Sequence, residues 1–134
     1  MRIVIDTNIV ASAIFFGGRP RELLELLLQR ELRAFISQEI VDEYRDTIEY
    51  LQNEYPNKRV AVPLTQIISA CEMVEPTSIV KVCRDPNDDK FIACAVDSRS
   101  LYVVSGDKDL LAVKLYADVR VVTVAEFFRE IWEK

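Results

Sequence analysis

Residues 2–8, RIVIDTN, and residues 101–109, LYVVSGDKD, decide the fold that this chain is expected to adopt. In each stretch, a short run rich in β-branched residues, typical of a buried strand, is followed by polar residues. Asp6 ends the first run, and Asp107 follows the second after Ser105 and Gly106. Aspartate is a good helix N-cap, so either residue alone has a structural explanation. Two carboxylates at two strand ends favour a shared role.

The chain around these stretches alternates between strand and helix patterns. Strands are expected at residues 2–5, 34–36, 101–104 and 119–122. Helices are expected at 9–16, 20–31, 38–53, 64–74, 88–98 and 108–116, with a last helix from 124 to 132. Ser37 is the expected N-cap of one helix, and Thr123 with Glu126 forms a capping box for the last. This alternation predicts an α/β fold, a three-layer sandwich around a central parallel sheet, with ligands beyond the carboxyl ends of its strands.

Length and composition limit the classes of protein that remain. The chain has 134 residues, of which 50% are hydrophobic, which fits a single domain over residues 1–134 with a substantial core. It contains no histidine, which excludes Ser-His-Asp chemistry, paired-imidazole nucleases and every histidine-ligated metal site. The net charge of −5 excludes a generally basic polyanion-binding protein, although a local basic rim is still compatible with it.

The sequence predicts a cytoplasmic protein with no membrane contact. The opening residues lack the apolar run of a signal peptide, and no run approaches the length of a membrane helix. Cys71, Cys83 and Cys94 form no CxxC pair, and their odd number suits no closed disulfide set. We therefore expect three reduced thiols.

Further acids lie in residues 85–90, DPNDDK, and on the helix expected at 38–53. Three acids within five residues exceed the need for a helix cap, although an acidic helix N-terminus is the simpler explanation. On the helix expected at 38–53, an apolar stripe includes Ile40 and Tyr44, and Glu43 lies about 60° from Ile40. Glu43 is therefore the acid nearest the buried face of that helix, where an ordinary surface ion pair would also explain it.

If Asp6, Glu43, Asp89 and Asp107 converge, their mutual repulsion is tolerable when they hold a hard divalent cation. All-oxygen ligands select Mg²⁺ or Mn²⁺, which can activate water for phosphodiester hydrolysis without histidine. Polar neighbours could orient waters or a phosphate, although caps explain them equally well; these are Thr7, Asn8 and Ser105. The weakly indicated RNA phosphate contacts are Arg19, Arg84, Lys90 and Lys108.

The ordered set of motifs resembles the PIN domain family, in particular its toxin branch, which is similar to VapC-type toxins. The resemblance covers nearly the whole chain, through VIDTNIVASAIFFGGRP, SQEIVDEY, RDPNDDKFIACAV, VVSGDKDLL and VVTVAEFF. Asp6, Glu43 and Asp107 match the first, second and fourth family acids. The third is best matched by Asp89, with Asp88 as its close rival and Asp85 less favoured. Asp109 matches an auxiliary acid.

The resemblance implies a sheet of order 3-2-1-4-5 and a ribonuclease that depends on Mg²⁺ or Mn²⁺ and cleaves single-stranded RNA. It also implies a toxin of a toxin–antitoxin pair, an antitoxin protein as a possible partner, and a homodimer.

Other functions remain open at this stage. A phosphatase-like Mg²⁺-dependent hydrolase needs a second acid two residues after its nucleophilic aspartate. This chain has Asn8 at that position, which counts against this class. A receiver domain needs an aspartate after a middle strand, where this chain has Ser37. A non-catalytic interaction module with the same fold would instead use the apolar helix expected at 9–16 and the leucine-rich run at 23–28 as a partner surface.

Overall fold

The computed structural model describes residues 1–132, and its centre is a six-stranded sheet of order β3-β2-β1-β4-β6-β5. The strands are β1 (Arg2–Ile5), β2 (Arg33–Ile36), β3 (Glu72–Met73), β4 (Tyr102–Val104), β5 (Leu115–Tyr116) and β6 (Val119–Val122). All neighbours pair in parallel except β5, which pairs antiparallel with β6. The five parallel strands are β3-β2-β1-β4-β6, which is the expected order 3-2-1-4-5 when these five are numbered along the chain without β5. The α/β fold is confirmed.

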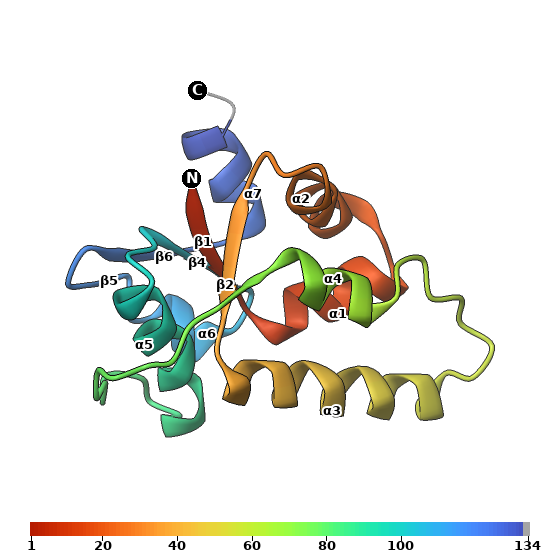
Figure 1. The fold of residues 1–134 in the computed structure, drawn as a ribbon, viewed down its shortest axis with the longest axis horizontal. Coiled ribbons are helices and arrows are strands. Elements are labelled where there is room, and N and C mark those ends of the chain that lie inside the picture. The colour runs from red at the N-terminus through yellow and green to blue at the C-terminus, as the bar shows by residue number, and fades with distance from the viewer. Residues whose placement is uncertain (133–134) are drawn as a thin grey trace.

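Helices pack around this sheet and make it a three-layer structure (Figure 1). They are α1 (Thr7–Phe15), α2 (Gly18–Leu28), α3 (Gln38–Glu54), α4 (Leu64–Ala70), α5 (Asp89–Asp97), α6 (Lys108–Leu111) and α7 (Val124–Glu126), with a 3₁₀ turn η1 (Pro86–Asp88) and a π-helical segment η2 (Phe127–Trp132). Helix α5 contacts β1, β2, β4 and β6, and α2 packs against α1, α4 and α7. None of the helices in residues 1–132 has the length and apolar character that a membrane span requires.

The central strands are buried because they carry apolar residues at every position inside the sheet. Ile3 and Val4 of β1 and Val103 and Val104 of β4 have no exposed surface. Strands covered on both faces read as continuous apolar runs, which is the pattern that predicted them. The carboxyl ends of β1 and β2 lie at the same end of the molecule as the start of α3 (Figure 1). The polar residues that follow the strands therefore meet there.

Two predicted caps are confirmed. The side chain of Ser37 accepts a hydrogen bond of 3.4 Å from the backbone N–H of Ile40 and begins α3. Thr123 and Glu126 form the reciprocal capping box at the start of α7. Each cap satisfies backbone donors that the first turn of a helix leaves without a partner.

Three predicted helices differ from the structure. The helix expected at 64–74 ends at Ala70, and Glu72–Met73 instead pairs with β2 as an edge strand. The helix expected at 108–116 ends at Leu111, and Lys114, with a φ of 64°, turns the chain into β5. The last helix leaves the α-helical pattern at Phe127. In the first two, pairing with a neighbouring strand overrides the apolar periodicity, and edge strands this short have no periodicity of their own.

Cys71, Cys83 and Cys94 are all free thiols, as expected.

Candidate metal centre

Asp6 and Asp107 meet at the ends of the neighbouring strands β1 and β4, and Ser105 lies between them. The hydroxyl of Ser105 donates a hydrogen bond of 2.7 Å to Oδ2 of Asp6 and accepts one of 2.9 Å from the backbone N–H of Asp107. The backbone N–H of Asp6 also donates to the carbonyl of Val104 at 2.9 Å. The sheet register therefore holds both aspartates at one place.

Asp6 is buried, with 4% of its surface exposed, and its surroundings favour the protonated acid. Burial raises the pKa of Asp6 from 3.8 to about 6 against the hydrogen bonds from Ser105 and the Thr7 backbone, which lower it. The negative charges of Asp107 and Glu43 raise it further. The raised pKa of Asp6 therefore reflects its burial first and the neighbouring negative charges second.

Glu43 reaches this site from α3, and both of its carboxylate oxygens have partners. Oε2 accepts a hydrogen bond from the hydroxyl of Thr7, the first residue of α1. Oε1 accepts from Nζ of Lys90 at 2.7 Å and from Nδ2 of Asn87 at 3.2 Å. The prediction that Glu43 lies nearest the buried face of α3 is confirmed, since the other acids of that helix are exposed.

Asp88 is the acid of the DPNDDK stretch that joins the site. It is 8% exposed, and its Oδ2 is buried without a hydrogen-bond partner. Carboxylate oxygens of Asp88, Asp107 and Asp109 lie within 4.8 Å of one another. Burial raises the pKa of Asp88 from 3.8 to about 7, and the charges of Asp107, Asp85, Asp6 and Glu43 add to this rise.

Asp89, the favoured third acid in the sequence analysis, faces a different part of the molecule. Its Oδ1 accepts hydrogen bonds from the backbone N–H groups of Val82 at 3.1 Å and Cys83 at 2.8 Å. Burial alone would raise the pKa of Asp89, but these two N–H groups lower it below its ordinary value. The structure therefore brings Asp88, the rival candidate, to Asp107, and uses Asp89 to hold the preceding segment.

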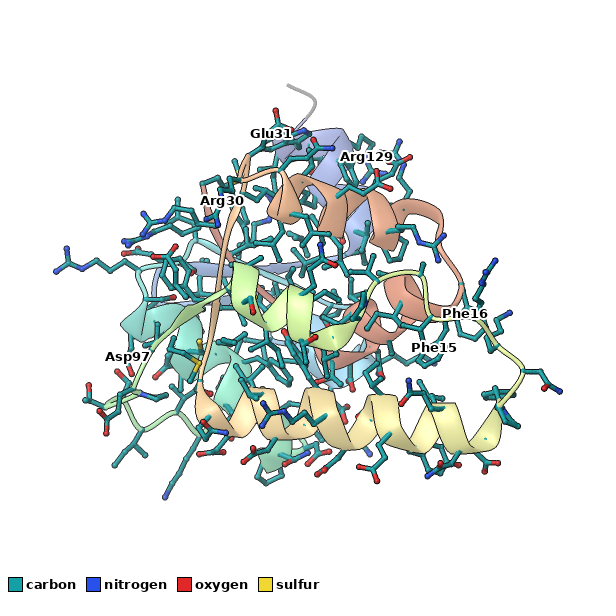
Figure 2. The ribbon with its side chains drawn as sticks, turned by 45° about the vertical axis from the view of Figure 1, so that its right-hand side comes forward. Phe15, Phe16, Arg30, Glu31, Asp97 and Arg129 are labelled. Atoms are coloured by element: carbon teal, nitrogen blue, oxygen red, sulfur yellow. The ribbon has the colours of Figure 1, made fainter. Side chains whose placement is uncertain are left out.

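Asp97, at the other end of α5, fastens the same segment. Its Oδ2 accepts hydrogen bonds from the backbone N–H groups of Thr77 at 2.7 Å and Ser78 at 3.0 Å. Figure 2 shows Asp97 beside the extended chain that leads into the third motif. Asp89 and Asp97 thus fix residues 77–83 along α5.

The other predicted site residues either accept local hydrogen bonds, contact neighbouring side chains or lie exposed at the surface. Asp85 accepts a hydrogen bond of 3.0 Å from the backbone N–H of Asn87, and Asp107 accepts one of 2.7 Å from that of Asp109. Arg19 lies over the ring of Phe128 at 4.6 Å and pairs with Glu22 at 3.6 Å. The exposed members of the set are Asn8, Arg19, Arg84, Asp85 and Lys108.

Comparison with known proteins gives the family. Residues 2–109 match the family model of the PIN domain. The chain belongs to the PIN domain family. It is also 31% identical over 121 residues to an uncharacterized protein, MJ1680, of Methanocaldococcus jannaschii, and the match covers 85% of this chain and 76% of that protein. No solved structure matches the chain significantly. PIN domains are generally nucleases that use divalent metals, and an acidic cluster of this kind is present here.

The acidic residues of this PIN domain fit a divalent cation. The buried Oδ2 of Asp88 has no donor, and an unpaired buried carboxylate oxygen is costly unless a cation compensates for it. The three side chains of the cluster, Asp88, Asp107 and Asp109, all offer carboxylate oxygens, which favours Mg²⁺ or Mn²⁺ over softer metals. A bound ion of this kind would supply Lewis-acid activation of a phosphodiester and a lowered pKa for an attacking water.

The signal for Asp88 in this PIN domain was present in the sequence. At 100° per residue, Phe91, Ile92 and Ala95 form a stripe whose centre lies about 15° from Asp88 and about 115° from Asp89. All three are fully buried, so the stripe is the face of α5 that packs on the sheet. The same argument that identified Glu43 would therefore have selected Asp88. No comparable signal predicts the contacts of Asn87 and Lys90 with Glu43, because these join elements far apart in the chain.

Proposed function

We propose that this PIN domain is a metal-dependent endoribonuclease that hydrolyses phosphodiester bonds of single-stranded RNA. The ion, Mg²⁺ or Mn²⁺, would be held by Asp6, Asp88 and Asp107, with Glu43 and Asp109 at its margin. The observation that carries the proposal is the buried, unpartnered Oδ2 of Asp88 beside Asp107 and Asp109.

The surrounding residues support this role by fixing the carboxylates. Ser105 orients Asp6, and Thr7 orients Glu43. The backbone N–H groups of Asp109 and Leu110 donate to Oδ1 of Asp107, at 2.7 Å and 3.4 Å. Sites held in place before a ligand arrives lose less free energy on binding, so this arrangement favours cation binding.

Cleavage of labelled single-stranded RNA tests the proposal. We expect cutting with Mn²⁺, no cutting with EDTA, and loss of cutting in Asp6→Asn purified in parallel. The products should carry a 5′-phosphate and a 3′-hydroxyl, because an activated water attacks in line. Cutting that survives the substitution points to a contaminant, and a 2′,3′-cyclic phosphate contradicts a hydrolytic mechanism.

We extend the proposal to a toxin of a toxin–antitoxin pair that acts as a homodimer, on the resemblance of the motifs to VapC-type toxins. Induced expression should then arrest growth, and the Asp107→Asn variant should not. Arrest by both proteins, or by neither when both are expressed and folded, would contradict the toxin role while leaving the nuclease proposal intact. Sedimentation would test the dimer.

A further inference from the structure

Lys90 is a largely buried lysine whose ammonium group is held by three oxygen atoms. Its side chain is 10% exposed. Nζ lies 2.7 Å from Oε1 of Glu43 and donates at 2.9 Å to both the carbonyl oxygen and Oδ1 of Asn87. An ammonium group has three protons to donate, so this one is fully satisfied.

These contacts join parts of the site that lie far apart in the chain. Lys90 is on α5, Asn87 is in the turn η1 that carries Asp88, and Glu43 is on α3. Asn87 completes the triangle through its own bond of 3.2 Å to Glu43. The ammonium thus holds the turn that presents Asp88 against the helix that presents Glu43.

The position of this charge matters because the site is otherwise acidic. Asp6, Asp88 and Asp107 repel one another, as the raised pKa values of Asp6 and Asp88 indicate after the larger effect of burial. A positive charge paired with Glu43 offsets part of that repulsion when no metal ion is bound. The same charge repels an incoming divalent cation.

We propose that Lys90 is the internal counter-ion of the acidic site, stabilising the metal-free protein and opposing metal binding. The proposal rests on the metal site of the proposed function. Lys90 would stabilise the metal-free state more than the metal-bound state. Its removal should therefore lower the stability of the metal-free protein and make the binding of the ion tighter. A residue that only positions a metal ligand would have the opposite effect on affinity.

The test compares Lys90→Met, Lys90→Arg and Lys81→Met with the wild-type protein. Methionine keeps the length and apolar stem of the side chain without its charge, and arginine keeps the charge. Lys81→Met is the matched control, since it removes the same charge from an exposed side chain just before the third motif. Thermal unfolding in EDTA reports the metal-free protein, and calorimetric titration with Mn²⁺ reports affinity. Circular dichroism checks that each variant folds.

For Lys90→Met we expect a Tm in EDTA lower by about 3 °C or more and Mn²⁺ binding tighter by about threefold or more. Lys90→Arg should bind Mn²⁺ within about twofold of wild type because it keeps the positive charge. Lys81→Met should do so because salt screens the exposed charge that it removes. Weaker or unchanged Mn²⁺ binding by Lys90→Met, or an unchanged Tm in EDTA, would overturn the proposal. A wild-type protein that bound no Mn²⁺ would instead overturn the proposed metal site, so the two failures are distinguishable.

Discussion

Ser105 donates a hydrogen bond of 2.7 Å to Asp6 across the junction of two neighbouring parallel strands. The two residues are 99 positions apart in the chain, and only the pairing of β1 with β4 brings them together. Ser105 has no exposed surface and also accepts the backbone N–H of Asp107. One buried hydroxyl therefore sets the geometry of two of the proposed metal ligands.

Ser105→Ala should weaken Mn²⁺ binding more at pH 6 than at pH 8. The hydrogen bond from Ser105 lowers the pKa of Asp6, so its loss raises that pKa above about 6 and leaves more of the carboxyl protonated at pH 6. The loss should also cost about 1 kcal/mol of unfolding free energy. Calorimetric titration at both pH values measures the effect. Ser98→Ala, which removes a buried hydroxyl 2.7 Å from that of Ser100, is the control. An equal loss of affinity at both pH values would contradict the role of the hydroxyl.

Asp88→Asn should abolish metal-dependent RNA cleavage, whereas Asp89→Asn should retain most of it. The Oδ1 of asparagine at position 89 can still accept from the backbone of Val82 and Cys83, but an amide at position 88 removes a charged ligand. Initial rates with saturating Mn²⁺ measure the difference.

Asp89→Ala separates the two roles further. It leaves two backbone N–H groups without their acceptor and should lower the unfolding free energy by about 1–3 kcal/mol. The reverse pattern, with activity lost in Asp89→Asn and kept in Asp88→Asn, would show that Asp89 is the third acid.

The metal-free protein should lose stability as pH rises from about 4 to about 7. Asp6 and Asp88 have pKa values raised from 3.8 to about 6 and about 7, so in this range the folded state binds more protons than the unfolded state. The unfolding free energy then falls with pH by a few kcal/mol and levels off above about pH 8, once Asp88 is ionised in the folded state as well. Urea unfolding in EDTA measures it. Asp88→Asn should flatten the curve, and a stability that rises with pH over this range would contradict the raised pKa values.

Tyr44→Phe should destabilise the fold without changing the proposed site. The hydroxyl of Tyr44 is buried and donates to the carbonyl of Ile5, so its removal leaves a buried acceptor with one partner fewer. The expected cost is about 1–2 kcal/mol in unfolding free energy. Mn²⁺ affinity below the melting transition should stay at the wild-type value. A large loss of affinity would mean that this bond, rather than Ser105, fixes the end of β1.

Much of the architecture could be predicted because the decisive signals are local. The apolar strands, the cap at Ser37 and the capping box at Thr123 each lie within a few residues, and the structure confirms them. The face of α3 that carries Glu43 followed from periodicity. The edge strands β3 and β5 could not be predicted in this way. Each has two residues, and its conformation depends on a partner strand elsewhere in the chain.

The choice between Asp88 and Asp89 shows the same limit inside the site. The position of Asp89 directly before Lys90, Phe91 and Ile92 favoured it by resemblance, whereas burial distinguishes the two acids in the structure. What the sequence could not supply is the partner of each carboxylate: backbone N–H groups for Asp89 and neighbouring acids for Asp88. Such contacts depend on tertiary packing.

Titration of Mn²⁺ into the metal-free protein tests the central claim, that these acids form a divalent metal site, most directly. The account predicts saturable binding by the wild-type protein and a loss of affinity of about tenfold or more in both Asp88→Asn and Asp107→Asn. Asp46→Asn, which alters an exposed acid of α3, should bind as wild type. Equal binding by all four proteins, or no binding by the folded wild-type protein, would contradict it.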